Sequence, residues 1–317
     1  MLDLRLTFAF EYNDQQNMNT FFDVIIAGGS YSGLAAAMAL GRALKTVLVI
    51  DSGLPCNRQT PHSHNFLTQD GSTPKEITTN AKKQVRQYDT VAFLNDIATK
   101  GNKVQNGFEI MTASGRTFFG VKLIFATGIR DILPDIEGLS ACWGISALHC
   151  PYCHGYEVRN ERTGIIGNGE QGFELARLIS NWTEDLTLFT NGISTLTSQQ
   201  ELQLQHHRIR IIKKEIEYLD HSNGFVQNIV LKDQSKEPVK AIYLRPPFEQ
   251  HSDMPEMMGC ELTEDGYLKI DAFQETTVPG LYAVGDNASR LRTVANAASM
   301  GTAAGITISR KMIFEQF

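Results

Sequence analysis

Short apolar runs and helical patterns alternate along the chain, and one order of them occurs twice. The first occurrence begins with the apolar run 22–27, continues through a glycine-rich turn into a helical pattern that ends near residue 43, and closes with the run 46–51. Short apolar runs bounded by turn residues are typical of buried strands, whereas longer stretches with a period of about 3.6 residues are typical of helices. The pattern therefore predicts a strand–turn–helix–strand unit.

The second occurrence begins at residue 163. It has a strand pattern at 163–166, a second glycine turn, a helical pattern at about 171–182 and a strand pattern at 186–190. Strands that alternate with helices in this way form parallel sheets covered by helices. We therefore expect an α/β fold with two Rossmann-like dinucleotide-binding domains, which indicates the duplication of one unit.

Elsewhere the pattern predicts shorter elements. The segment 55–74 and the stretch after Pro246-Pro247 are rich in turn residues, so we expect loops there. Further strands are expected at 91–97, 107–112, 121–126, 209–212, 226–231, 241–244, 267–270 and 280–284, and further helices at about 74–88 and 294–311.

The first glycine turn has the spacing of a dinucleotide-binding site. It reads Gly28-Gly29-Ser30-Tyr31-Ser32-Gly33. In the usual G-x-G-x-x-G pattern the glycines permit a tight turn, a close approach of the backbone to a pyrophosphate and close packing of helix on strand, and here Ser30 replaces the second glycine. Asp51 ends the next strand, where a carboxylate accepts hydrogen bonds from a ribose. Strand, helix and acid together favour a dinucleotide site over a turn that serves packing alone.

The second glycine turn is complete in its glycines. It reads Gly167-Asn168-Gly169-Glu170-Gln171-Gly172. The next strand ends in Thr190-Asn191-Gly192, which offers neither an acid for a 2′-hydroxyl nor an arginine for a 2′-phosphate. We expect a nicotinamide site for NADPH or NADH with no readable preference, and the alternative is a fold that no longer binds nicotinamide.

Two cysteines two residues apart lie just before this second unit, in His149-Cys150-Pro151-Tyr152-Cys153-His154. A C-x-x-C segment brings two thiols close enough for a disulfide, and a neighbouring histidine supplies a charge that favours the thiolate. The alternative is a zinc site. A structural zinc site usually takes further ligands from a second pair at a set spacing, and the sequence has no such pair. The segment therefore predicts a redox-active dithiol and no metal.

Composition narrows the class of protein. The five cysteines include a single tight pair, which fits a reducing compartment and predicts a cytoplasmic protein. The net charge of −6 argues against a nucleic-acid or anionic-membrane partner, and no apolar run is long enough to span a bilayer. Residues 1–17 lack the pattern of a signal peptide, and Met18 is an alternative start.

With these motifs in this order, the chain resembles the low-molecular-weight thioredoxin reductase family from residue 22 onward. The resemblance rests on four matches: the first glycine turn, Ala126-Thr127-Gly128 after a strand, the C-x-x-C pair, and Gly285-Asp286 at the end of a strand near the C-terminus. It implies a flavin-dependent disulfide oxidoreductase with FAD held at the first glycine turn, Asp51, Thr127, Gly128, Gly285 and Asp286.

The resemblance also implies an organisation. Residues 20–132 and 247–317 would form the FAD-binding domain, residues 133–246 an inserted NAD(P)-binding-like domain that carries the dithiol, and residues 1–19 an extension. A homodimer is implied as well. By position, Asn65 and Thr293 match flavin contacts of the family. Cys153 matches the cysteine that reacts with the flavin, Cys150 the cysteine that exchanges with substrate, and His154 the acid/base residue, usually an aspartate.

Three departures set the chain apart from thioredoxin reductases. The C-x-x-C segment has a different sequence, the first glycine turn contains Ser30, and the basic cluster that holds NADPH is replaced by Thr190-Asn191-Gly192. The first two resemble the gliotoxin- and holomycin-type dithiol oxidases, which close disulfides in small molecules and return electrons to oxygen. Three functions follow: reduction of a thioredoxin-like protein or small disulfide, oxidation of a small dithiol, and a non-enzymatic flavin- or metal-binding module with a sensing or structural dithiol.

Overall fold

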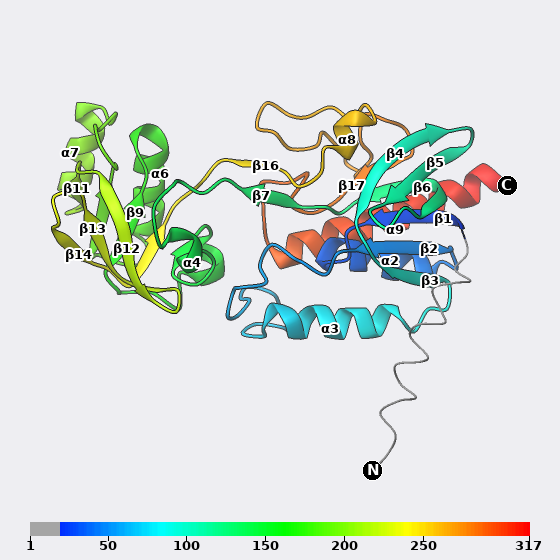
Figure 1. Cartoon of the computed structure of the whole chain (residues 1–317), viewed down its shortest axis with the longest axis horizontal. Helices are drawn as coiled ribbons and strands as arrows, with labels where there is room; N and C mark the ends of the chain where they lie inside the picture. Colours follow the sequence, from blue (N-terminus) through cyan, green and yellow to red (C-terminus); the bar gives the residue numbers. More distant parts are fainter. Residues whose placement is uncertain (1–19) are drawn as a thin grey trace, which may run out of the picture. The chain divides into compact units, whose positions relative to one another are not determined.

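A computed structural model of the chain describes residues 20–317, so the expected extension at residues 1–19 lies outside the described residues. The chain forms two compact units, which we call the first and second units (Figure 1). Of the described residues, the first unit comprises 20–54, 80–129 and 250–317, and the second comprises 55–79 and 130–249. The segment 55–79 thus groups with the unit that carries the dithiol.

The first unit is built on a seven-stranded sheet with β1 (Phe21–Ala27) near its centre. This strand pairs in parallel with β2 (Val47–Asp51) and with β6 (Thr117–Phe125), which also pairs with β17 (Leu281–Ala283). Apolar side chains fill both faces of these strands, as expected for a parallel sheet that is covered on both sides. The remaining strands are β3 (Val91–Asn95), β4 (Ala98–Val104) and β5 (Gly107–Thr112), and a short helix, α8 (Met254–Met257), also lies in this unit.

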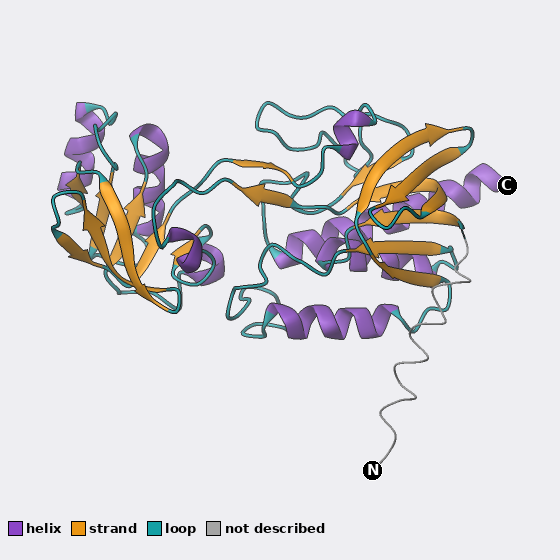
Figure 2. Cartoon of the chain, viewed as in Figure 1, coloured by secondary structure: helices purple, strands orange, loops and turns teal. Residues whose placement is uncertain are grey.

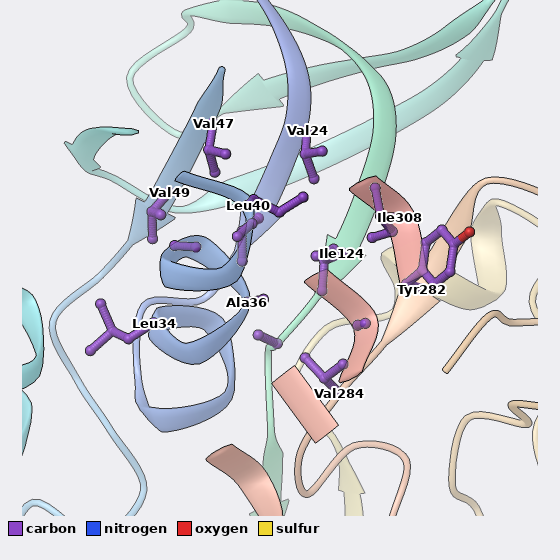
Figure 3. Close-up of a cluster of buried hydrophobic side chains, with 14 of the residues drawn as sticks. Val24, Leu34, Ala36, Leu40, Val47, Val49, Ile124, Tyr282, Val284 and Ile308 are labelled. Atoms are coloured by element: carbon purple, nitrogen blue, oxygen red, sulfur yellow. The ribbon is translucent and has the colours of Figure 1, made fainter. Parts of the chain in front are cut away.

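Two helices cover one face of this sheet. Helix α2 (Tyr31–Arg42) follows the first glycine turn, and α9 (Val294–Gln316) is the last element of the chain. Figure 3 shows Leu34 and Leu40 from α2, and Ile308 from α9, in one cluster with side chains of the strands. The helices approach closely because glycines of α9 face α2: a Cβ added at Gly301 would lie 2.0 Å from the carbonyl oxygen of Ser32.

The close approach of the two helices predicts a stability effect. Alanine has a better intrinsic helix propensity than glycine, yet we expect Gly301→Ala to destabilise the first unit by about 1–3 kcal/mol, because the new methyl group overpacks the contact with α2. Denaturant unfolding measures the change. The matched control is Thr302→Ala on the exposed side of α9, which should alter the free energy of unfolding by less than about 0.5 kcal/mol. Equal stability of the two variants would contradict the packing argument.

The second unit also combines a parallel sheet with helices, and its sheet has five strands instead of seven (Figure 2). Its parallel sheet has the order β11-β10-β9-β15-β8. The members are β8 (Ala147–Leu148), β9 (Thr163–Ile166), β10 (Leu186–Phe189), β11 (Arg210–Ile212) and β15 (Ala241–Tyr243). The helices are α4 (Leu139–Cys142), α5 (Pro151–His154), α6 (Gly169–Ile179) and α7 (Ser198–His206).

An antiparallel sheet completes the second unit, with the order β12-β13-β14. Its strands are β12 (Ile216–Ser222), β13 (Phe225–Leu231) and β14 (Lys236–Pro238). The chain passes between the units along β7 (Ile129–Asp131) and β16 (Phe248–Gln250), which pair with each other, and along α3 (Pro74–Val85).

The expected α/β class with two Rossmann-type units is confirmed, and several local expectations are wrong. The stretch after Pro246-Pro247, expected as a loop, contains β16 and α8. Within the described chain, residues 267–270 form no strand: Leu268 and Ile270 each make a single bridge, to Leu262 and Thr276, because this stretch folds as successive turns. Helix α7 was not expected, because its face is almost entirely polar. A capping box between Thr197 and Gln200 starts it, which is a signal that hydrophobic periodicity does not contain.

Candidate active site

The dithiol lies where β8 leaves the parallel sheet of the second unit. Cys150 precedes the one-turn helix α5, whose first residue, Pro151, has the backbone angle that a helix start requires. The Sγ atoms of Cys150 and Cys153 lie 2.7 Å apart. This is far inside van der Waals contact and somewhat beyond the roughly 2.05 Å of a disulfide bond. Both side chains are half-buried, so the turn holds two sulfurs ready to form and break one bond while keeping access to solvent.

The dithiol turn ends in His154, and three further ionisable groups lie near it: His64, Asp70 and Glu157. The rings of His154 and His64 meet edge to face with their centroids 6.4 Å apart. Nδ1 of His64 lies 3.6 Å from a carboxylate oxygen of Asp70 and 3.6 Å from one of Glu157. Burial lowers the pKa of His154, the nearby His64 lowers it further, and the Glu157 carboxylate opposes both effects. The imidazole of His154 is therefore neutral at pH 7 and able to accept a proton.

A cavity of about 310 Å³ adjoins this turn. It is lined by aromatic and polar side chains together: His64, Asn65, Asp70, Pro151, Tyr152, Tyr156, Glu157 and Trp182. The ring of Tyr152, which stands between the two cysteines, is 62% exposed and meets the indole of Trp182 edge to face at 5.5 Å. The guanidinium of Arg159 covers the ring of Tyr156 at 3.9 Å. The cavity thus offers flat apolar surfaces beside a carboxylate and an imidazole.

The sequence reasoning missed several of these residues. No motif singles out His64, yet its side chain is half-buried and its ring meets that of His154. No sequence motif contains Glu157, Trp182 or the buried Tyr243 of β15. His64 reaches the site through the folding of segment 55–79, and the other residues reach it through the packing of the second unit, so no local pattern contains that information.

The first glycine turn has the geometry of an anion-binding helix start. Gly28 has a φ of +109°, and a Cβ there would lie 2.2 Å from the carbonyl oxygen of Ala126. Ser30 is the N-cap of α2 but makes no side-chain cap within the described chain, and the first turn carries no acid. The backbone amides at this helix start can therefore bind a pyrophosphate.

Asp51 stands beside this turn, as expected. Its Oδ1 accepts a hydrogen bond from the amide of Gly29 at 3.2 Å, and its Oδ2 lies 2.7 Å from Nζ of Lys82. A carboxylate has about four acceptor sites, so these two contacts leave capacity for a ribose hydroxyl. No sequence motif indicates the lysine, and its ion pair with Asp51 fixes the orientation of the carboxylate.

Other predicted flavin residues gather at the same edge of the first sheet. Thr127 and Gly128 follow β6, and Gly285 and Asp286 follow β17, which pairs with β6. Asn287 is fully buried and joins the two strand ends: its Nδ2 donates to the carbonyl of Phe125 at 2.9 Å and to Oγ1 of Thr127 at 3.3 Å.

The two remaining predicted flavin contacts, Thr293 and Asn65, lie in different units. Thr293 caps α9 by accepting a hydrogen bond from the amide of Asn296 at 3.1 Å. It stays in the first unit with Asp286, whose carboxylate lies 3.9 Å from the guanidinium of Arg292. Asn65 belongs to the second unit, where it lines the cavity beside Tyr152. The start of α2 without a side-chain cap, the carboxylate of Asp51, and the glycines after β6 and β17 together fit the binding of an FAD dinucleotide.

The second glycine turn is built differently. Oδ1 of Asn168 caps α6 by accepting from the amide of Gly169 at 2.9 Å, and it also accepts from the amide of Thr195 at 2.8 Å. Nδ2 of Asn168 donates to the carbonyl of Ile193 at 2.7 Å, so one side chain ties the loop 190–195 to the turn. Glu170 places a negative charge in the first turn of the helix. Gly167 and Gly172 do pack closely, since a Cβ at Gly172 would lie 2.7 Å from the carbonyl carbon of Gly167. The glycine packing is present, but the helix start is already capped and is negatively charged.

Between residues 20 and 317, no three His, Cys, Asp or Glu side chains are grouped so that they could hold a metal ion. Within the same range, no helix is both long and apolar enough to cross a membrane.

Comparison with known proteins places the chain. The pyridine nucleotide-disulphide oxidoreductase family matches residues 22–301. The thioredoxin reductase aclD of Aspergillus oryzae is 30% identical over 307 residues, which cover 93% of this chain and 98% of the relative. The structure of an oxidoreductase from Agrobacterium tumefaciens is 35% identical, with a TM-score of 0.87 and coverage of 92% of this chain and 99% of that chain. The structure of HlmI is 29% identical, with a TM-score of 0.89 and coverage of 95% of both chains.

The chain belongs to the pyridine nucleotide-disulphide oxidoreductase family. It is a thioredoxin reductase-like, flavin-dependent oxidoreductase, which confirms the expected family, fold and enzyme class. FAD is the cofactor of this family and NAD(P)H is its electron donor.

Proposed function

We propose that this chain oxidises a small-molecule dithiol to its disulfide through Cys150 and Cys153. The observation that carries the proposal is the aromatic cavity of about 310 Å³ beside the dithiol turn. Pockets of roughly 300–1,000 Å³ suit small ligands, with apolar walls for the body of the ligand and a few polar groups for its orientation. Tyr152 and Trp182 supply the walls, and Glu157 and His64 supply the polar groups.

The exchange chemistry follows from the two sulfurs. A substrate thiolate attacks Sγ of Cys150, the bond between Cys150 and Cys153 breaks, and Cys153 leaves with the electron pair. The second substrate thiol then attacks the mixed disulfide, closes the substrate disulfide and releases Cys150. The substrate loses two electrons and two protons, and the enzyme dithiol gains the electrons. Bound FAD would supply the acceptor for these two electrons, with dioxygen as the final oxidant and hydrogen peroxide as its product.

His154 supports this direction of reaction. Because its imidazole is neutral at pH 7, it can take the proton from an attacking substrate thiol. Reduction of a disulfide instead needs a proton donor for the leaving thiolate, and a neutral imidazole does not supply one as readily. The residue thus has the protonation state that dithiol oxidation requires.

The domain roles belong to the same proposal. The first unit would hold FAD at Gly28–Gly33, Asp51, Thr127-Gly128 and Gly285-Asp286, and the second unit would present the dithiol. The family resemblance supports a homodimer, and the five cysteines with a single tight pair support a cytoplasmic location. Light scattering on the purified protein tests the dimer.

A second candidate is disulfide reduction with NAD(P)H as the donor. It is favoured by the family and by the name of the Aspergillus oryzae relative, a thioredoxin reductase. Its substrate would be a thioredoxin-like protein or a small disulfide. The preserved glycines of the second turn are the structural feature on its side.

Anaerobic mixing of the yellow holoenzyme with NADPH, with NADH and with a small aromatic dithiol separates the two candidates. We expect the dithiol alone to bleach the flavin absorbance rapidly, and admission of oxygen to restore it with formation of hydrogen peroxide. Rapid bleaching by a nicotinamide and none by dithiols would sink the oxidase proposal and establish the reductase. Bleaching by neither would leave the dithiol as a non-enzymatic sensing or structural element.

The lowered pKa of His154 predicts a pH profile. As pH falls, the rate should decline only where His154 gains a proton, which happens below its ordinary value of 6.5 because burial and His64 oppose the charged form. In His154→Gln this acid limb should disappear and the plateau rate should fall by about 10²-fold or more. The control is His62→Gln, which removes a loop histidine bonded to the carbonyl of Gly71. An unchanged profile in His154→Gln would remove His154 from the reaction.

A further inference from the structure

A buried tyrosine lies beneath the dithiol turn and has no role in the family resemblance. Tyr243 is the last residue of β15, and in the parallel register it stands beside Leu148 of β8 on one side and Ile165 of β9 on the other. Its side chain is 1% exposed and belongs to the apolar cluster that contains Leu148 and Phe173, with Val158 packed against it. Its ring is therefore part of the apolar core against which the segment after β8 packs.

The phenol oxygen of Tyr243 has no hydrogen-bond partner among the described residues. Burial of an unpaired hydroxyl costs free energy, and phenylalanine would fill the same space without that cost. A phenol kept in such a place is explained if an acceptor is present in another state of the protein.

The dithiol supplies that acceptor. From Leu148, the register neighbour of Tyr243, the chain reaches Cys150 in two residues. The ionisable groups that act on the phenol are Cys150, Glu157 and Cys153, in that order of strength, and together with burial, the largest effect, they raise the pKa of Tyr243 far above its ordinary value. The hydroxyl therefore stays protonated at every working pH and is a permanent hydrogen-bond donor. Each of the three groups, when ionised, would accept that hydrogen bond, and Cys150 exerts the strongest influence.

We propose that the hydroxyl of Tyr243 donates a hydrogen bond to the thiolate of Cys150 when the pair is reduced, and so is a positioning residue for the exchanging sulfur. In the present arrangement Sγ of Cys150 is engaged with Sγ of Cys153 at 2.7 Å. The two cysteines are not joined by a disulfide. If the sulfurs of the reduced pair move apart to van der Waals distance, Sγ of Cys150 could turn toward the sheet. His154 is neutral at pH 7 and gives the thiolate no positive charge, so a buried hydroxyl donor would add stabilisation that this imidazole does not provide.

The test compares Tyr243→Phe with the wild type. The reduced holoenzyme is treated anaerobically with iodoacetamide between pH 5 and pH 10, and the peptide that carries Cys150 and Cys153 is quantified by mass spectrometry. Loss of a hydrogen bond to a charged group should slow alkylation of Cys150 at pH 7 by about tenfold and move its midpoint upward by about one pH unit. Tyr282→Phe is the matched control, because Tyr282 is a fully buried tyrosine of the first unit.

Two outcomes decide the question. A profile of Cys150 in Tyr243→Phe that equals those of the wild type and Tyr282→Phe would overturn the proposal. If the substitution loosens the fold, alkylation at Cys150 and Cys153 should rise together, whereas the proposal requires a selective loss at Cys150, so the ratio of the two within one protein still decides. The inference rests on the exchange role of Cys150 in the proposed function. That role is tested separately by flavin bleaching in the wild type, which does not involve Tyr243.

Discussion

Cys150→Ser is expected to lower turnover of a small dithiol by about three orders of magnitude or more and to leave the FAD content unchanged. A hydroxyl cannot form the mixed disulfide, so the exchange has no first step. FAD should remain because all its predicted contacts except Asn65 lie in the first unit, whereas Cys150 lies in the second. Flavin absorbance per protein and dithiol-dependent oxygen uptake measure the two properties. The matched control is Cys56→Ser, which replaces an exposed cysteine outside the C-x-x-C pair.

Cys153→Ser should abolish turnover equally, but for a different reason that can be measured. In a Cys56→Ser background, the reduced protein is treated with one equivalent of the aromatic disulfide 5,5′-dithiobis(2-nitrobenzoate). With both cysteines present, Cys150 forms a mixed disulfide and Cys153 resolves it, so two thionitrobenzoate ions are released per site. With Cys153→Ser the mixed disulfide should persist after one release. Full turnover in either serine variant would contradict the dithiol mechanism, and complete resolution in Cys153→Ser would reverse the assigned roles.

NADPH is expected to bind weakly and with little preference over NADH. A thioredoxin reductase grips the 2′-phosphate with cations, and the corresponding strand end here is Thr190-Asn191-Gly192. Each charge-assisted hydrogen bond is worth roughly 1.5–3 kcal/mol, so the absence of two weakens binding by roughly two to four orders of magnitude. The cap by Asn168 and the charge of Glu170 act in the same direction, because both compete with a pyrophosphate at the start of α6.

The nearby arginines do not replace the missing cations. Arg210 stands beside Thr187 at the amino end of β11, whereas nucleotides bind at the carboxyl ends of parallel strands. Its guanidinium lies 3.1 Å from the carboxylate of Glu237. Arg208 precedes the same strand and lines a separate cavity of about 340 Å³ together with Glu201 and Lys213.

Calorimetric titration of the oxidised holoenzyme with NADPH, and separately with NADH, measures both affinities. Glu170→Gln should tighten both nucleotides by a similar factor, up to about fivefold, because it removes the negative charge at the helix start. Glu174→Gln is the control, since Glu174 is exposed on the same helix but lies beyond its first turn. Micromolar NADPH affinity with strong discrimination against NADH would refute the prediction and support the reductase.

The sequence by itself determined the class of this protein. The run 22–27 is apolar at nearly every position because its strand is buried on both faces, and such a local pattern is legible without the rest of the chain. The first glycine turn is legible for a similar reason, because only glycine tolerates the φ of Gly28 and its approach to Ala126. The C-x-x-C pair is legible because its spacing alone brings two sulfurs together.

Only the tertiary structure decided what surrounds the two cysteines. The ring of His64 meets that of His154, and Tyr243 stands in register beside Leu148, two residues before Cys150, through contacts between segments that are about 90 residues apart in the chain. Glu157 is close in sequence, but its effect on His154 depends on how the turn folds. Whether a histidine in a polar loop is solvated or half-buried depends on which segment packs over it, and a local pattern carries no record of that packing. The protonation state of His154 and the unpaired hydroxyl of Tyr243 are consequences of burial, so they became visible only once the chain was folded.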